Sequence, residues 1–457
     1  MRAISLVDRL EFDFNGNVLR RGLTLGDVDN DGLNELIIGS ENGDLVIFKD
    51  VKKWVSLTGL SFISCITVGD ILNLGKNCLV VITADGWCYI YYVHHVLEPQ
   101  TDEGVDQVDG QIFSSESIES EKSRSSESIA NTSTSEKVKV ELKQLHLQRI
   151  PANTKDVLLA DIDGDGCLEL IIGLTDRIVR SYRWISSNTQ TVDILNVSGN
   201  LVCLNKWECA KQIGSITLHH SNDGVPSLLV AQPGGTFMRI ICQTDDICPS
   251  LETTGEHSDS GSSRTESLIG SKIDYQFLGI SRARNQNIST EIVGDIINKR
   301  EDRRGHPYTV ATLDGTIMLV YDEIILWSIA VDHQIFSLHK MDITNCGNDN
   351  IIACSWDGQT YILDQDKNSV RFQLEESVQA FDCGFYNVYD NVNSSCLVYV
   401  TFHNKVYLYY DLPLKKMTCK KFEPDVSKLS EIVEGKHLDQ KSKNELVQFL
   451  LYGVKNV

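Results

Sequence analysis

Short apolar runs separated by polar turns repeat along most of the chain. Each unit has an apolar run, a polar loop, a second run such as 35–39 or 169–173, an Asn-Gly or Asp-Gly turn, and a third run. Apolar runs of this length, bounded by turn residues, are typical of buried β-strands. The pattern therefore predicts antiparallel hairpins rather than helices.

Seven such units can be recognised, and in three of them the turn glycine stands sixteen residues after an aspartate (Asp27, Asp70 and Asp342). The turns predict type I′ hairpins, which need positive φ at both central residues. A fourth strand follows in several units. Four short strands, repeated seven times, predict an all-β fold, a seven-bladed β-propeller. The predicted blades cover residues 22–60, 62–95, 152–207, 211–243, 287–330, 333–375 and 377–412.

The ring of a propeller must be closed, because an open ring leaves an unpaired strand edge. The seventh unit has no obvious fourth strand before Pro413. Segment 4–14 is strand-like and belongs to no unit. We therefore expect it to complete the seventh blade, with a free N-terminal arm as the alternative.

Three stretches depart from the repeat. Residues 98–140 and 249–272 are rich in Ser, Glu and Asp, which predicts disordered insertions between units. They are interpreted as solvated loops, although Ser beside Glu also suits phosphorylation. Residues 413–457 form a C-terminal tail whose apolar spacing predicts two short amphipathic helices, which pack either on the propeller or on a partner.

Composition narrows the class of protein. The net charge of −21 over 457 residues repels phosphate backbones, so no nucleic-acid partner is expected. The N-terminus has no apolar leader, and no apolar run reaches the length of a membrane span. Thirteen cysteines lie scattered without paired spacing, which predicts reduced thiols in a cytoplasmic protein.

Two loops between first and second strands are rich in acids. Each has carboxylates at positions 1, 3, 5 and 9 and a glycine at position 6. Alternate carboxylates on a tight loop converge, and together with the backbone carbonyl at position 7 they offer the oxygen ligands that Ca²⁺ prefers. The predicted ligands are Asp27, Asp29, Asp31, Leu33 and Glu35 in the first loop and Asp161, Asp163, Asp165, Cys167 and Glu169 in the second.

These loops are not EF-hands. An EF-hand needs a bidentate Glu at position 12, where this chain has Ile38 and Ile172 inside strands. A β-loop-β calcium site with a structural role remains. The alternative is a loop without metal, held by backbone hydrogen bonds.

Known catalytic motifs are missing from the sequence. It contains no Gly-x-Ser-x-Gly elbow, no Walker loop and no His-Glu-x-x-His. We therefore expect an interaction scaffold rather than an enzyme. A calcium-gated binding module and a hydrolase built across the propeller axis are the alternatives.

The acid-rich unit, with its following Glu-Leu-Ile-Ile-Gly, resembles the FG-GAP repeat of integrin α-subunits. Several longer stretches resemble the integrin-alpha FG-GAP repeat-containing protein 2 family. The resemblance runs through most of residues 1–412. It is carried by residues 150–155, 161–167, 331–334, 356–361 and 397–402.

This resemblance implies a function that spacing and composition do not. It implies a non-enzymatic subunit of the KICSTOR complex, recruited from the cytoplasm to the lysosomal membrane surface through its partners. Those partners would be a kaptin-like propeller, a large seizure-threshold-related subunit and the other KICSTOR members. The complex would recruit the GTPase-activating complex for Rag GTPases and restrain target-of-rapamycin signalling when nutrients are scarce.

Overall fold

The computed structural model describes residues 1–97, 138–187, 193–243, 270–278, 287–299, 305–389 and 391–412, together with five isolated later positions. The chain divides into a compact unit, Met1–Leu412, and a second unit, Pro413–Val457. The expected helices of the tail lie almost wholly outside the described residues, as do most of the two expected insertions. Among the described residues, no helix is long and apolar enough to cross a bilayer.

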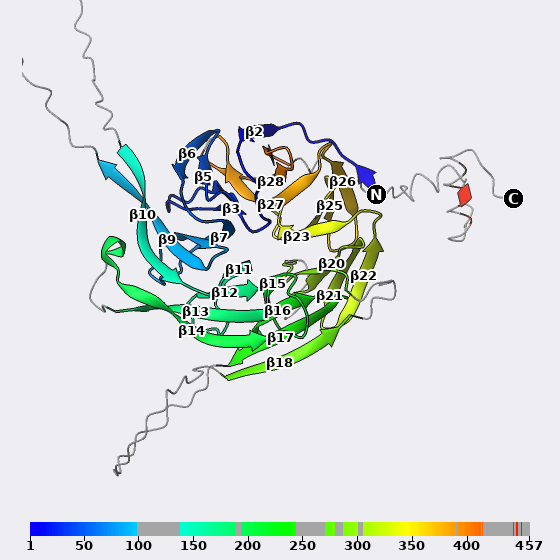
Figure 1. The fold of residues 1–457 in the computed structure, drawn as a ribbon. Coiled ribbons are helices and arrows are strands. Elements are labelled where there is room, and N and C mark those ends of the chain that lie inside the picture. The colour runs from blue at the N-terminus through cyan, green and yellow to red at the C-terminus, as the bar shows by residue number, and fades with distance from the viewer. Residues whose placement is uncertain are drawn as a thin grey trace, which may run out of the picture. The chain divides into compact units, whose positions relative to one another are not determined.

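The described residues of the first unit form seven sheets of four or five strands (Figure 1). Blade 1 has β3 (Leu23–Gly26), β4 (Glu35–Gly39), β5 (Leu45–Lys49) and β6 (Lys52–Leu57). Blade 2 has β7 (Ile63–Gly69), β8 (Cys78–Thr83), β9 (Trp87–Leu97) and β10 (Val138–Arg149). Blade 3 has β11 (Thr154–Ala160), β12 (Glu169–Leu174), β13 (Ile178–Ser186) and β14 (Gly199–Glu208), with the 3-10 helix η1 (Ile194–Asn196) before β14.

The remaining blades repeat this order. Blade 4 has β15 (Ile216–His220), β16 (Pro226–Gln232), β17 (Thr236–Gln243) and β18 (Gly270–Phe277). Blade 5 has β19 (Thr290–Val293), β20 (Tyr308–Thr312), β21 (Thr316–Tyr321) and β22 (Ile324–Ala330). Blade 6 has β23 (Ile335–Met341), β24 (Asn350–Ser355), β25 (Gln359–Leu363) and β26 (Ser369–Gln373). Blade 7 has β27 (Val378–Asn387), β28 (Asn393–Thr401) and β29 (Lys405–Tyr410), completed by β2 (Arg9–Asp13).

The ring closes, and the seven-bladed propeller is confirmed. The first strand of each blade contacts the first strand of the next, and β27 of blade 7 contacts β3 of blade 1. β2 pairs antiparallel with β29, as expected for a closing strand. The N-terminal segment also does something that was not expected, because β1 (Arg2–Ala3) pairs in parallel with β26 as a fifth strand of blade 6.

Sheet-on-sheet packing explains why the second strands are apolar throughout. All five residues of β4 are buried, because a blade is covered on both faces by its neighbours. Leu36 and Ile38 pack with residues of blade 7, whereas Ile37 packs with residues of blade 2. Successive side chains along one strand therefore belong to two different cores.

The Asn-Gly and Asp-Gly hairpin turns differ from the type I′ prediction, because φ is positive at the glycine alone, whereas blade 4 has positive φ at both Gly234 and Gly235. In the turn of blade 2, φ is positive at Gly86 but not at Asp85, and the Gly86 N–H donates to the Thr83 carbonyl. A side chain on Gly86 would collide with the carbonyl of Ile150, which begins the link to blade 3. One left-handed residue is enough, and close approach of that link fixes it as glycine.

The two Ser-rich insertions lie within blades, not between units as expected. Residues 98–137 separate β9 from β10 in blade 2, and residues 244–269 separate β17 from β18 in blade 4. Residues 138–140 and 270–272, assigned to the insertions from composition, begin the outer strands β10 and β18. Each insertion thus joins a third strand to the fourth strand of the same blade.

A cluster of ion pairs links the inner strands of distant blades. The segment between β2 and β3 carries Arg20 and Arg21, whose guanidinium groups reach Glu291 on β19 and Asp156 on β11. The Arg20–Glu291 contact measures 2.5 Å. Asp156 is also an acceptor for the Ile216 N–H of blade 4, at 2.6 Å. This central ion-pair cluster therefore connects the segment before blade 1 with blades 3, 4 and 5.

Next to the cluster, His339 on β23 lies 3.3 Å from Asp382 on β27. Burial, with Arg21 and Arg20 nearby, lowers the pKa of His339 to about 3. The imidazole is therefore neutral at neutral pH. Its Nε2 lies 2.8 Å from the Ser337 hydroxyl, so it takes part in a partly buried hydrogen-bond network.

We expect the closing strand to determine thermal stability. Phe12 on β2 is 5% exposed, and its ring lies 4.6 Å from that of Phe48 in blade 1. Phe12→Ala should destabilise the protein by about 3 to 5 kcal/mol, because it opens a cavity at the seam. Thermal unfolding followed by circular dichroism measures the effect. Val7→Ala, at a position 83% exposed, is the control and should match the parent. Equal midpoints for all three proteins would show that the seam does not limit stability.

We also expect the central ion-pair cluster to hold the blades together. Arg21→Met should lower the free energy of unfolding by about 3 to 5 kcal/mol, because Asp156 stays buried without its cation. Urea unfolding measures this loss. The double variant Arg21→Met/Asp156→Asn should be more stable than Arg21→Met alone. If the loss of unfolding free energy in the double variant equals the sum of the losses in the two single variants, the two side chains do not interact.

Candidate functional site

The two acid-rich loops lie in equivalent places, between β3 and β4 in blade 1 and between β11 and β12 in blade 3. In each, three acids offer carboxylate oxygens that all lie within 4.8 Å of one another. The converging residues are Asp27, Asp29 and Glu35 in the first loop and Asp161, Asp163 and Glu169 in the second. Three of the predicted ligands therefore converge in each loop, whereas Asp31 and Asp165 are not among the converging residues, and each cluster could hold a metal ion.

The first aspartate of each loop binds the loop's own backbone. Both carboxylate oxygens of Asp27 accept N–H groups, from Asp31 at 3.1 Å and from Gly32 at 3.0 Å. Asp161 accepts the N–H groups of Gly164 and Gly166 in the same way, at 2.7 and 2.8 Å. Position 1 therefore shapes the turn directly.

The acid at position 9 anchors the other end of the loop. Glu35 is fully buried, and its Oε2 accepts the Val28 N–H at 3.0 Å. Glu169 is equally buried and accepts the Ile162 N–H at 3.1 Å. This bond closes the loop across its base in both blades.

Positions 5 and 7 interact with each other. Asp31 Oδ1 accepts the Leu33 N–H, and Asp165 Oδ1 accepts the Cys167 N–H, both at 2.8 Å. The backbone N–H groups of Leu33 and Cys167 therefore bind inside their loops, whereas their backbone carbonyls were predicted as metal ligands.

A basic side chain from the third strand enters each cluster. Lys49, at the end of β5, has its Nζ 2.5 Å from Asp29, 2.6 Å from Asp31 and 2.9 Å from Glu35. The Lys49 ammonium also lies over the Trp54 ring, 4.9 Å from its centroid. Burial alone lowers the pKa of Lys49, but its hydrogen bonds to the three carboxylates raise this pKa above the usual range.

In blade 3 the same place is taken by Arg183 on β13. Its Nε lies 2.6 Å from Glu169, Nη1 lies 2.6 Å from Asp165, and Nη2 lies 3.1 Å from Asp163. Burial lowers the pKa of Arg183, but the hydrogen bond to Glu169 and the nearby carboxylates raise it overall. Each loop therefore surrounds a charged base.

Reasoning from the sequence missed both bases, although a signal was present. Lys49 stands 22 residues after Asp27, and Arg183 stands 22 residues after Asp161. A search confined to the loop finds the acids and overlooks the strand that lies across from them.

The loops also join neighbouring blades. The Asn30 side chain donates to the Asn77 carbonyl at 3.1 Å and accepts the Asn77 N–H at 2.7 Å, which links blade 1 to blade 2. Asn73 makes the same pair of bonds to Leu168, at 3.2 and 2.6 Å, and links blade 2 to blade 3. Both acid-rich loops thus carry one side of an inter-blade contact.

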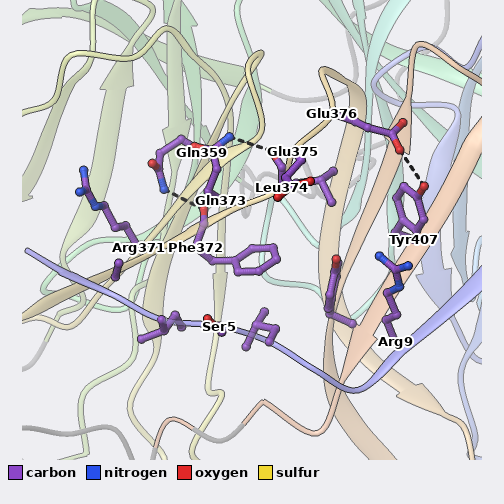
Figure 2. A pocket seen from close by; sticks show the side chains of 14 residues that line it. Ser5, Arg9, Gln359, Arg371, Phe372, Gln373, Leu374, Glu375, Glu376 and Tyr407 are labelled. Carbon is purple, nitrogen blue, oxygen red and sulfur yellow. Dashed lines mark hydrogen bonds between the residues drawn. The ribbon is translucent and has the colours of Figure 1, made fainter.

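A cavity of about 810 Å³ between blades 6 and 7 is the second candidate (Figure 2). The N-terminal segment lines one side. On the other, Tyr407 donates to Glu376 at 2.7 Å, and Arg9 of the N-terminal segment lies over the Tyr407 ring. The Gln359 amide donates to the Phe372 carbonyl at 2.8 Å. The Gln359 bond lies within blade 6, and the Tyr407 bond joins blade 7 to the link that follows β26. These polar groups at the cavity therefore already bond to one another.

Comparisons with known proteins agree with this architecture. The crystal structure of BBS1N in complex with ARL6DN, soaked with lead, matches with a TM-score of 0.53 at 13% identity, covering 90% of this chain and 98% of that one. The same complex soaked with mercury gives a TM-score of 0.52 at 12% identity, with the same coverage of both chains. At such identities the likeness concerns the fold alone.

Closer relatives share the sequence itself. "KICSTOR complex protein ITFG2" of Mus musculus is 36% identical over 428 residues, covering 91% of this chain and 87% of the relative. The protein of that name from Bos taurus is 34% identical, covering 91% of this chain and 73% of the relative. The family model "Integrin-alpha FG-GAP repeat-containing protein 2" matches residues 47–414. The chain therefore belongs to the integrin-alpha FG-GAP repeat-containing protein 2 family.

Proposed function

We propose that this chain is a non-enzymatic scaffold subunit of the KICSTOR complex at the lysosomal surface. The observation that carries the proposal is its similarity to two proteins named as KICSTOR complex proteins, which extends over 91% of the chain. A match of this extent spans most of the propeller.

In this role the chain joins a kaptin-like propeller, a large seizure-threshold-related subunit and the other KICSTOR members. Together they recruit the GTPase-activating complex for Rag GTPases and restrain target-of-rapamycin signalling when nutrients are scarce. The chain reaches the lysosomal membrane from the cytoplasm through these partners. A strongly acidic chain is suited to binding proteins and poorly suited to binding phosphate backbones.

The structure supports a scaffold in a second way. Its conspicuous charged groups bind one another: Arg20 pairs with Glu291, and Arg21 pairs with Asp156. Such pairs join blades that are distant in sequence, and this is what a rigid platform for several partners requires.

A calcium-dependent binding module with other partners is the second candidate. It is favoured by the convergence of three carboxylate oxygens in each acid-rich loop. Partner binding would then require Ca²⁺ and would be lost in a chelator. Assembly that persists in chelator would support the scaffold.

The scaffold is tested in cultured mouse cells that lack their own "KICSTOR complex protein ITFG2" and express the tagged chain instead. We expect the other KICSTOR subunits to co-purify with it at comparable amounts, with or without chelator. Target-of-rapamycin activity, followed by substrate phosphorylation, should fall again on amino-acid withdrawal. An unrelated seven-bladed propeller with the same tag is the control.

Two results would overturn the proposal. One is a folded, expressed chain that brings down no KICSTOR subunit. The other is signalling that persists without amino acids although the chain is present on lysosomes.

A further inference from the structure

We infer that Lys49 and Arg183 take the place of a divalent cation, so that both acid-rich loops are braces that need no metal. This inference concerns the stability of the propeller and is independent of the scaffold proposal. It rests on where the two bases lie, on which blades have them, and on the role of the first aspartate in blades that lack the other acids.

The position of Lys49 leaves no room for an ion among the same oxygens. Its Nζ lies 2.5 to 2.9 Å from carboxylates of Asp29, Asp31 and Glu35. A bound Ca²⁺ would need oxygens at about 2.3 to 2.6 Å, which would put it against the ammonium. Two cations at that separation repel each other strongly. Binding would therefore require Lys49 to leave its three partners.

The donors of each base match the acids around it. An ammonium has three N–H donors, and Lys49 contacts three carboxylates. A guanidinium has donors on all three nitrogens, and Arg183 directs Nε, Nη1 and Nη2 to Glu169, Asp165 and Asp163 respectively. Two different bases thus meet the same need, neutralising acids that would otherwise repel one another.

Comparison between blades within this chain points the same way. Of the acids at positions 1, 3, 5 and 9, the equivalent loops of blades 2 and 6 keep only the first aspartate, and the residue 22 positions after it is Tyr92 or Asp364. A base stands at this position in the two blades with the full acid set, and not in these two. The base accompanies the acids as one interacting group.

Blades 2 and 6 also show what the first aspartate does without the rest. Asp70 accepts the N–H groups of Leu74 and Gly75, at 2.9 and 2.6 Å. Asp342 accepts those of Cys346 and Gly347, at 3.1 and 2.5 Å. Because the same turn forms around a single carboxylate, its geometry does not depend on a central ion.

The first test is a calcium titration of the full-length parent protein after dialysis against chelator. We expect no heat by isothermal titration at millimolar CaCl₂, and a thermal midpoint that does not move. Heat of binding for two ions per chain, with a rise in the midpoint, would overturn the inference.

The second test removes the bases. Lys49→Met/Arg183→Met should lower the midpoint in chelator by roughly 3 °C or more, because the acids stay buried without a cation. Millimolar CaCl₂ should now bind and restore part of the loss. Lys52→Met/Lys206→Met, which removes two exposed charges, is the matched control. Its midpoint in chelator should equal that of the parent and should not rise in CaCl₂.

The single variants decide the matter if the double variant does not fold. Each should lose stability in chelator and gain it in calcium, with one ion bound per chain. A midpoint equal to that of the parent in chelator, for both Lys49→Met and Arg183→Met, would show that the bases brace nothing.

Discussion

Pairing between β2 and β29 is the interaction on which the rest of the propeller depends. These strands join residues near the two ends of the described fold, since Phe12 lies opposite Val406. Each blade is covered on both faces by its neighbours, so a ring that opened at this seam would expose the apolar sides of blades 7 and 1. Phe12 and Phe48 contact each other across it. The closing strand is therefore part of the core.

The same N-terminal segment contributes twice more. Before β2, Arg2 and Ala3 extend blade 6 in parallel. After β2, the chain turns inward and brings Arg20 and Arg21 to Glu291 and Asp156. One stretch of about twenty residues thus seals the outer edge of the ring and crosses to its inner strands. The N-terminal segment therefore connects blades that are far apart in the sequence.

Local patterns were sufficient to predict the units and the closing strand, because apolar runs and glycine turns are properties of a few adjacent residues. The outer strands β10 and β18 were harder, since an edge strand is partly exposed and alternates with polar residues. Their starts were therefore assigned to the insertions. The Arg20–Glu291 pair spans 271 positions, and nothing near Arg20 identifies its partner. The two acid-rich loops were predicted in part. Their carboxylates were found from the local sequence, but the bases that pair with these carboxylates were not.

A base on the chain and a bound ion stabilise a loop in different ways. Stabilisation by an ion grows with its free concentration relative to its dissociation constant, and disappears when the ion is scarce. Lys49 and Arg183 are part of the chain, so their positive charges are present at every concentration of free ions. The loops that they hold also keep the contacts from Asn30 to blade 2 and from Leu168 to blade 2 in place. The scaffold role proposed above, in which several surfaces keep a fixed arrangement, is better served by such a constant brace than by one that responds to calcium.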